Sequence, residues 1–322
     1  MELDVIDRKL VNLVQNFPLA RQPYSQLGGR LGVSEDKVME RIARLKKEGI
    51  IRQISPVLDA SCLGYQTTLV AMRVAEDKLD KTEQVISQHP SVSHGYEREN
   101  YYNLWFTLVV SPGTPIETEV ERLASAVDCE AAFSLPAVKR FRIGAYFDVD
   151  GDGSINGTAQ PGRCQKVDLS DVDRLVINEL QQDLPLVSEP FTLMASRLGM
   201  EVASFLNCCR SILERGVMRR YGASVNHHKV GFQANAMTCW KVPADEVDAA
   251  GQELASLREV SHCYERQTNS FWQYNLFAMI HGHSREFCQA IADDVSRKLG
   301  LSDYVLLFST REFKKARNRY LV

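Results

Sequence analysis

Apolar residues recur with helical spacing at the start of the chain, and the same pattern returns in its second half. Between residues 4 and 14 they repeat every three or four positions, which predicts an amphipathic helix. A second short helix is expected before Gly32, and Ser34 can cap a third helix that stops at Gly49. A strand-like run follows, and residues 171–225 repeat the order. The pattern predicts a winged helix-turn-helix in each half.

After each winged helix, the pattern changes to alternating strands and helices. Short runs with period-two alternation predict strands, and amphipathic runs of about a dozen residues predict helices. The expected order in the first half is strand 66–74, helix 78–89, strand 92–98, strand 102–110, helix 115–127 and strand 138–147. This β-α-β-β-α-β order predicts a ferredoxin-like domain, and hence an α+β fold.

The whole chain is a tandem duplication. "IDRKLVN", which begins at Ile6, matches "VDRLVIN", which begins at Val172 and lies 166 residues later. The offset is 172 between Asn103 and Asn275, which places a short insertion in the second copy. A repeat this long is a two-domain module rather than a solenoid unit. The expected units are winged helix-turn-helix domains at 1–60 and 167–228, ferredoxin-like βαββαβ domains at 61–149 and 229–322, and a linker at 150–166.

The segment between the copies is rich in Gly, Asp and Pro, which is typical of a linker. Residues 148–159 also resemble the start of an EF-hand calcium loop. However, Ala159 occupies the position of the bidentate Glu that such a loop requires, and no helical pattern follows. We therefore interpret the segment as a linker rather than a calcium site.

The composition is that of a folded protein of the cytoplasm. Of the 322 residues, 44% are hydrophobic and 25% are charged, and the formal net charge is -3. That charge gives no general attraction to polyanions, so any anion site must be local. No apolar run reaches the roughly 18 residues that span a membrane, and the polar, acidic N-terminus is unlike a secretory signal. The eight cysteines include no C-x-x-C pair, which favours reduced thiols over a disulfide framework or a zinc site.

The third helix of each winged domain lacks the basic excess that DNA binding requires. Residues 35–48 hold five basic and four acidic residues, and Glu35 and Asp36 open the turn that would meet the bases. Residues 201–213 hold one basic and one acidic residue. Because counterion release supplies much of the affinity for DNA, these helices are interpreted as structural, without a nucleic-acid partner. A DNA-binding regulator with a small effector remains the alternative function.

Two nine-residue stretches carry the candidate chemistry. "VSHGYEREN" at 92–100 and "VSHCYERQT" at 260–268 are identical at six positions. On a strand, His94, Tyr96 and Arg98 occupy alternate positions and project from one face. Such a face lacks the apolar side chains of a structural sheet. Histidine is the usual general acid near neutral pH, and a hydrogen-bonded structural histidine is the competing interpretation.

The two-domain module resembles the Lrp/AsnC transcription regulators over nearly the whole of each half. Within that superfamily, "SHGYERENYYNLWFTL" and "SHCYERQTNSFWQYNLFAMIHG" resemble the siroheme decarboxylases, with a departure at Gln273, where proline is expected. The resemblance implies that the two halves pair as a pseudo-dimer, with further homo-oligomerisation left open. It also implies non-oxidative removal of two acetate carboxyls from siroheme. The product would be 12,18-didecarboxysiroheme, for heme d1 or alternative heme biosynthesis, with no cofactor beyond the iron tetrapyrrole.

The same resemblance gives roles to individual residues. Siroheme is an iron isobacteriochlorin rimmed by acetates and propionates, so it requires cations at its edge and flat apolar walls. His94 and His262 are expected to be the proton donors, and one of them is a candidate axial ligand of the substrate iron. His281 and His283 are interpreted as surface residues. The expected substrate-binding residues are Tyr96, Arg98, Tyr102, Asn103, Trp105, Lys139, Arg140, Tyr264, Arg266, Trp272, Asn275 and Arg317.

Overall fold

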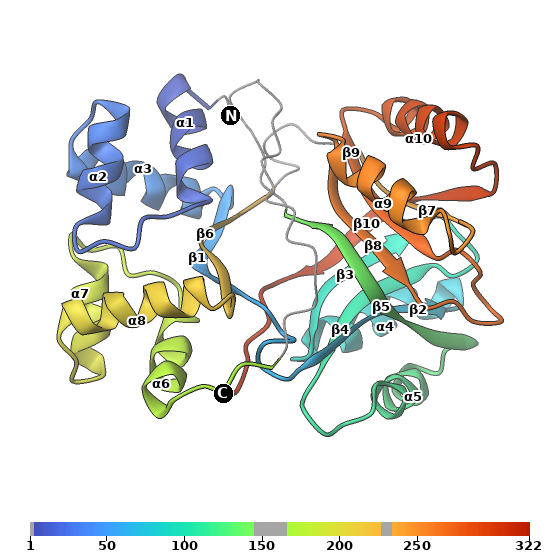
Figure 1. Ribbon diagram of the computed structural model, residues 1–322, viewed down its shortest axis with the longest axis horizontal. Helices are drawn as coiled ribbons and strands as arrows, with labels where there is room; N and C mark the ends of the chain where they lie inside the picture. Colours follow the sequence, from blue (N-terminus) through green and yellow to red (C-terminus); the bar gives the residue numbers. More distant parts are fainter. Residues whose placement is uncertain (1–2, 145–165, 227–233) are drawn as a thin grey trace.

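The computed structural model describes residues 3–144, 166–226 and 234–322. A layer of helices lies on one side of the molecule and a β-barrel lies on the other (Figure 1). Each half of the chain contributes one winged helix-turn-helix to the helical layer and one βαββαβ domain to the barrel. Residues 148–159, with their partial match to a calcium loop, lie outside the described residues.

Each winged-helix domain contains three helices, as the apolar spacing predicts. They are α1 (Val5–Val14), α2 (Pro23–Leu31) and α3 (Glu35–Lys47) in the first half, and α6 (Asp171–Leu180), α7 (Pro190–Arg197) and α8 (Val202–Glu214) in the second. Gly32 ends α2 in the left-handed conformation at φ 69°. The Ser34 hydroxyl accepts a hydrogen bond from the Lys37 amide at the start of α3. Both predicted helix boundaries are confirmed.

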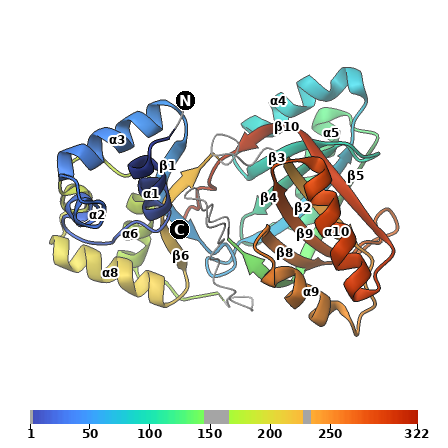
Figure 2. The same cartoon turned by 90° about the horizontal axis from the view of Figure 1, so that it is seen from above.

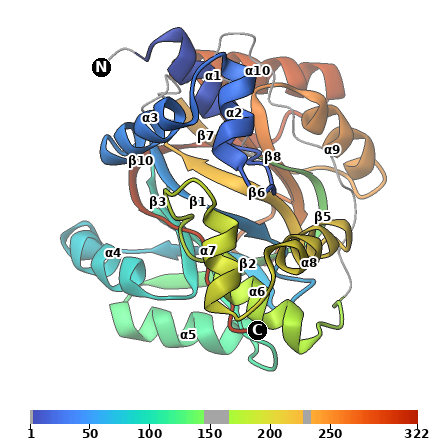
Figure 3. The same ribbon diagram turned by 90° about the vertical axis from the view of Figure 1, so that its left-hand side faces the viewer.

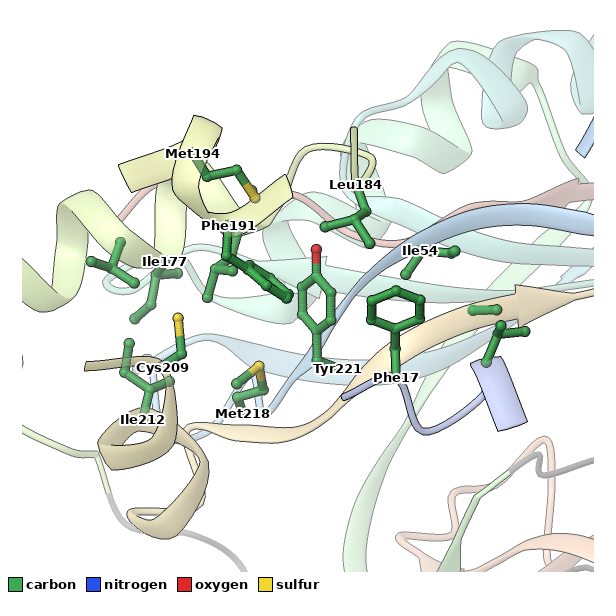
Figure 4. Packing of buried hydrophobic residues seen from close by; sticks show 14 of the residues in the cluster. Phe17, Ile54, Ile177, Leu184, Phe191, Met194, Cys209, Ile212, Met218 and Tyr221 are labelled. Carbon is green, nitrogen blue, oxygen red and sulfur yellow. The ribbon is translucent and has the colours of Figure 1, made fainter. Parts of the chain in front are cut away.

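The strand after each third helix pairs with its counterpart from the other half. β1 (Ile51–Leu58) and β6 (Met218–Val225) form an antiparallel two-stranded sheet. The predicted strand after each third helix is confirmed, and the strand of each copy covers an edge of the other. This pairing joins the two helical domains over one core, in which Tyr221 packs against Phe17 and Phe191 (Figure 4).

Each half continues with a ferredoxin-like domain in the predicted order. The first contains β2 (Gln66–Arg73), α4 (Leu79–Gln88), β3 (Val92–Arg98), β4 (Leu104–Val110), α5 (Ile116–Val127) and β5 (Ala131–Ile143). The second contains β7 (Ala234–Trp240), α9 (Val247–Ser256), β8 (Val260–Arg266), β9 (Leu276–Gly282), α10 (Arg285–Leu299) and β10 (Tyr304–Lys315). The four helices lie on the outside of the strands (Figure 2).

The last strand of each half belongs to both sheets. β5 starts earlier than predicted and pairs with β2 of its own half through Leu135, then with β8 of the other half through Arg140. β10 pairs with β7 through Leu307 and then with β3 through Glu312. We expected two sheets that pack against each other. Contact between the halves is confirmed, but its form is corrected, because the sheets continue edge to edge and close an eight-strand barrel (Figure 3).

Alternate positions on the barrel strands face two different cores. On β2, Val70 belongs to the core beneath α4 and α5, and its neighbour Leu69 belongs to a core inside the barrel. Trp105 and Leu135 also belong to this interior core. Polar side chains replace apolar ones inside the barrel where it meets the helical layer. That region holds the candidate site.

Six cysteines of the described residues are free thiols, namely Cys129, Cys208, Cys209, Cys239, Cys263 and Cys288. No helix in the described part of the chain has the length and apolarity needed to cross a membrane.

Replacing Gly95 should weaken the contact between the halves. An added Cβ on Gly95 of β3 would lie 2.2 Å from the ring of Phe313 on β10, so Gly95→Ala should cost about 1–3 kcal/mol of unfolding free energy. Gly29→Ala is the control, because nothing lies within 4 Å of that Cβ. Urea unfolding of both variants checks the prediction. Equal stability of the two variants would contradict it, and adding Phe313→Leu to Gly95→Ala should restore part of the loss.

Candidate active site

A cavity of about 770 Å³ lies where the barrel interior meets the winged-helix pair. This volume is within the range of roughly 300–1,000 Å³ that is usual for ligand pockets. Strands of both ferredoxin-like domains line it, and Asp59 and Arg219 extend the lining to the ends of β1 and β6. The C-terminal segment adds Asn318 and Tyr320. The site is therefore shared by all four domains.

Both repeated triplets project into this one cavity. His94, Tyr96 and Arg98 come from β3, and His262, Tyr264 and Arg266 come from β8. The predicted one-face arrangement on each strand agrees with this lining. Trp105 and Arg140 also line the cavity. The structure thus brings together eight of the residues singled out from the sequence.

The two arginines of the triplets cross from one half to the other. Arg98 Nη1 donates to the Leu307 carbonyl at 2.8 Å, and Arg266 Nη1 donates to the Leu135 carbonyl at 2.8 Å. The guanidinium carbons lie 5.0 and 4.8 Å from the ring centres of the tyrosines two residues earlier. Among the described residues, neither Nε has a hydrogen-bond partner. Burial lowers the pKa of Arg98 to about 10, which leaves it charged at neutral pH.

The two histidines are neutral and similarly anchored. His94 Nδ1 lies 2.9 Å from Ser93 Oγ, and His262 Nδ1 lies 2.8 Å from Ser261 Oγ. Burial, followed by the charge of Lys315, lowers the pKa of His94 to about 3 and that of His262 to about 4. The serine bonds leave Nε2 as the ring nitrogen that can meet a ligand.

The strands opposite the two triplets differ in charge. In the pairing of β10 with β3, Lys315 is the partner of His94 and Glu312 is the partner of Tyr96. At the matching positions of β5 and β8, Ile143 is the partner of His262 and Arg140 is the partner of Tyr264. The Tyr96 hydroxyl donates to Glu312 Oε2 at 3.3 Å. The first triplet therefore has an acidic and a basic residue opposite it, whereas the second has an apolar and a basic one.

Asp59 holds two of the cavity cations in place. Its Oδ2 accepts hydrogen bonds from Arg219 Nη2 at 2.7 Å and from Arg140 Nη1 at 3.1 Å. Burial works to raise the pKa of Asp59, but the charge of Arg219 and the hydrogen bonds of Ser61 and Arg219 outweigh it and lower the pKa to about 2. Sequence reasoning did not single out Arg219, and from the C-terminal basic run at residues 311–320 it selected Arg317 rather than Lys315. The basic pair at the start of β6 and the C-terminal basic run were the available signals.

Other predicted residues lie outside the cavity lining. Asn103 donates to the Val74 carbonyl at 2.8 Å and accepts from its amide at 3.0 Å. Asn275 does the same with Val242, at 2.9 and 2.8 Å. These asparagines brace the hairpins that follow the triplets, which explains their repetition. Neither asparagine lines this cavity, and their assignment as substrate-binding residues stays a prediction.

The remaining predicted residues are also displaced from it. Tyr102 and Trp272 join an aromatic cluster beyond the buried Trp105, with their ring centres 6.3 Å apart. Lys139 Nζ donates to Asp248 Oδ1 at 2.5 Å outside the lining. Arg317 bonds Ser55 and donates to the Gly222 carbonyl at 2.9 Å, which ties the C-terminal segment to the β1–β6 sheet. Within the described residues, no group of three His, Cys, Asp or Glu side chains could hold a metal ion.

Family models match both domain types in each half. The AsnC-like ligand binding domain matches residues 62–142 and 229–314. The Siroheme decarboxylase NirDL-like HTH domain matches residues 7–52 and 173–219. Both models match twice, in agreement with the tandem duplication.

Proteins of similar length match along nearly the whole chain. The siroheme decarboxylase of Hydrogenobacter thermophilus is 37% identical over 97% of the chain and 94% of its own length. The siroheme decarboxylase NirDL subunit of Paracoccus denitrificans is 30% identical over 98% and 97%. A crystal structure of siroheme decarboxylase NirDL in co-complex with an iron-uroporphyrin III analogue has a TM-score of 0.73 at 34% identity, covering 99% of the chain and 95% of that structure. The chain therefore belongs to the siroheme decarboxylase family, as a fused NirDL-type protein.

Proposed function

We propose that the protein removes two acetate carboxyl groups from siroheme without oxidation and yields 12,18-didecarboxysiroheme. The observation that carries this proposal is the single cavity into which both His–Tyr–Arg triplets project. A related crystal structure contains an iron-uroporphyrin III analogue, a tetrapyrrole that also has carboxylates on its rim. The chemistry of the cavity therefore suits siroheme as the substrate.

The charged rim of siroheme would be held by the cations of the cavity. Among the described residues, five Lys and Arg side chains line it, namely Arg98, Arg140, Arg219, Arg266 and Lys315. A guanidinium group binds a carboxylate through two parallel hydrogen bonds, which fixes direction as well as charge. Arg98 and Arg266 bring this group into the lining of the cavity from opposite halves of the chain. The tyrosines of the triplets would line the faces of the macrocycle.

The reaction requires one proton for each CO2 released. Protonation of the adjacent pyrrole carbon provides an electron sink, and the C–CO2 bond then breaks. A second proton converts the exocyclic methylene to a methyl group. The pyrrole carbon then loses the proton that it had gained, so one proton is consumed overall. His94 and His262 are the proposed donors. Carboxylates of the bound substrate favour the charged form of an imidazole. Substrate binding would therefore raise the low pKa values of His94 and His262 toward neutrality. A neutral imidazole can instead ligate iron, and one of the two is the proposed axial ligand.

The ion pairs of α3 disfavour the alternative, a DNA-binding regulator. Lys37, Arg41, Arg44 and Lys46 all form ion pairs with carboxylates of the chain. These pairs neutralise most of the positive charge that would contact phosphates. At the start of the helix, Glu35 accepts a hydrogen bond from Ser188 of the other winged domain at 2.6 Å. We therefore propose no nucleic-acid partner.

Anaerobic incubation with siroheme tests the proposed function. The tetrapyrrole mass should fall by two CO2 units per molecule, and His94→Ala or His262→Ala should lower turnover by roughly two orders of magnitude or more. Mass spectrometry and CO2 release measure both effects. Siroheme that binds and returns with unchanged mass would rule out the activity. Salt-sensitive binding to one specific DNA duplex would favour the regulator.

The triplet arginines should control affinity more than rate. Arg98→Lys or Arg266→Lys keeps a positive charge but removes the planar fork, so siroheme affinity should fall roughly 10- to 100-fold. Arg122→Lys is the control, because Arg122 pairs with Glu119 on the outer helix α5. Absorbance titrations of the three variants measure the dissociation constants. Unchanged affinity in both triplet variants would show that these arginines do not hold the rim.

Folding stability should fall between pH 7 and pH 5 because of the two histidines. Their lowered pKa values, about 3 for His94 and about 4 for His262, keep them neutral in the folded protein. In the unfolded chain both histidines titrate near pH 6.5, so below that pH the unfolded chain binds more protons than the folded protein. Each histidine then lowers the unfolding free energy by up to about 1.4 kcal/mol per pH unit. Urea unfolding checks this. The double variant His94→Gln/His262→Gln should lose less stability than the wild type on acidification. An equal loss in both proteins would contradict the lowered pKa values of the two histidines.

A further inference from the structure

A chain of hydrogen bonds leads from His262 to a third histidine. Ser261 Oγ lies 2.8 Å from His262 Nδ1 and 2.7 Å from His281 Nε2. All three side chains line the cavity, and His281 is 6% exposed, so its interpretation as a surface residue is corrected. A hydroxyl carries one proton, so Ser261 can donate to only one imidazole and accepts from the other. The protonation states of the two rings are therefore linked.

The first half has only the first two members of this chain. Val109 of β4 and His281 of β9 make the same backbone hydrogen bond in their domains, at 2.8 and 2.9 Å, and so occupy equivalent positions. His94 bonds Ser93 as His262 bonds Ser261, but Val109 stands where the third member would be. Valine can neither donate nor accept a proton. The two half-sites therefore differ in their capacity to store and return one.

We propose that His281 is a positioning residue that acts through Ser261 to set the tautomer of His262 and to replace the proton that His262 delivers. This inference rests on the proposed decarboxylation. When Ser261 donates to Nδ1, His262 carries its proton on Nε2, which is the nitrogen free to meet the substrate. The chain then resupplies His262 with a proton, whereas His94, the other proposed donor, has no such supply.

The proton transfer balances in atoms and charge. The C–CO2 bond breaks, its electron pair ends in a new C–H bond, and the proton comes from His262 Nε2. The Ser261 hydroxyl proton moves to His262 Nδ1, and the Nε2 proton of His281 moves to Ser261. His281 changes from imidazolium to neutral imidazole as the carboxylate becomes neutral CO2. After product release, a solvent proton enters at His262 Nε2 and drives the chain back.

The surroundings of His262 favour storage of the charge on His281. Lys315 of β10, Arg219 of β6 and Arg266 of β8 line the same cavity as His262, and the positive charge of each lowers the pKa of that ring. They oppose a resting positive charge on that ring. A proton held on His281 stays off the His262 ring and remains available during the reaction.

His281→Val tests the proposal, because it copies the residue of the first half. The kcat for siroheme should fall roughly 10- to 100-fold with an unchanged KM, since the residue does not contact the substrate carbon. The ¹⁵N shifts of His262 should change from a single Nε2–H tautomer to a mixture, which a merely structural role would not cause. His283→Val, at an exposed position outside the cavity lining, should behave as wild type. A His281→Val enzyme with wild-type kcat and an unchanged His262 tautomer would overturn the proposal.

Ser261→Ala supplies a second test that keeps both histidines. The double variant Ser261→Ala/His281→Val should be no slower than the slower single variant, because both changes break the same chain. If the falls in kcat of the two single variants multiply in the double variant, the relay is overturned. If His281→Val does not fold, Ser261→Ala alone supplies the test. Wild type in the same assay separates the hypotheses. An inactive wild type contradicts the proposed function, whereas an active wild type with unaffected variants contradicts the relay alone.

Discussion

The last strand of each half is longer than the sheet that it completes, and the rest of the structure depends on that extra length. β5 and β10 leave their own sheets midway and pair with β8 and β3 of the opposite half. Because β3 and β8 are the edge strands that carry the triplets, closure places each triplet beside the other half. The hydrogen bonds from Arg98 to Leu307 and from Arg266 to Leu135 exist only in this arrangement. Two unjoined domains would leave both triplets on open edges, without a common cavity.

The crossing strands also explain how a duplicated chain builds an asymmetric site. The triplets are identical in both halves, but the positions opposite them are not: Lys315 and Glu312 on one side correspond to Ile143 and Arg140 on the other. Ile143 and Arg140 of β5 lie opposite the second triplet only, whereas Lys315 of β10 acts on both histidines. Each histidine can therefore acquire its own electrostatic environment. The third histidine on β9 adds a difference within the second half itself.

Local patterns in the sequence predicted the elements and the triplets, because helical spacing, strand alternation and the i, i+2, i+4 positions are properties of short segments. They could not predict barrel closure, which depends on pairing between residues more than 100 positions apart, such as Arg140 with Tyr264. Lys315 and Arg219 reach the cavity only through such pairing. Asn103 and Asn275 show the opposite case. Their repetition indicated a role in the site, whereas their amides satisfy backbone groups of a hairpin.

The winged-helix pair is built as a fixed wall of this cavity. Arg52 of β1 bonds Glu312 at 2.7 Å, and Arg219 of β6 bonds the buried Asp59, so both strands place charge at the site. The pair shares one core, to which Tyr320 of the C-terminal segment also belongs. A dimeric helix-turn-helix protein that binds two DNA half-sites places its two recognition helices one helical turn of the duplex apart. Here the β1–β6 pairing and the shared core fix the two helical domains against each other, because separating them would expose buried apolar surface. That rigidity suits a module whose strands must hold cations around a bound ligand.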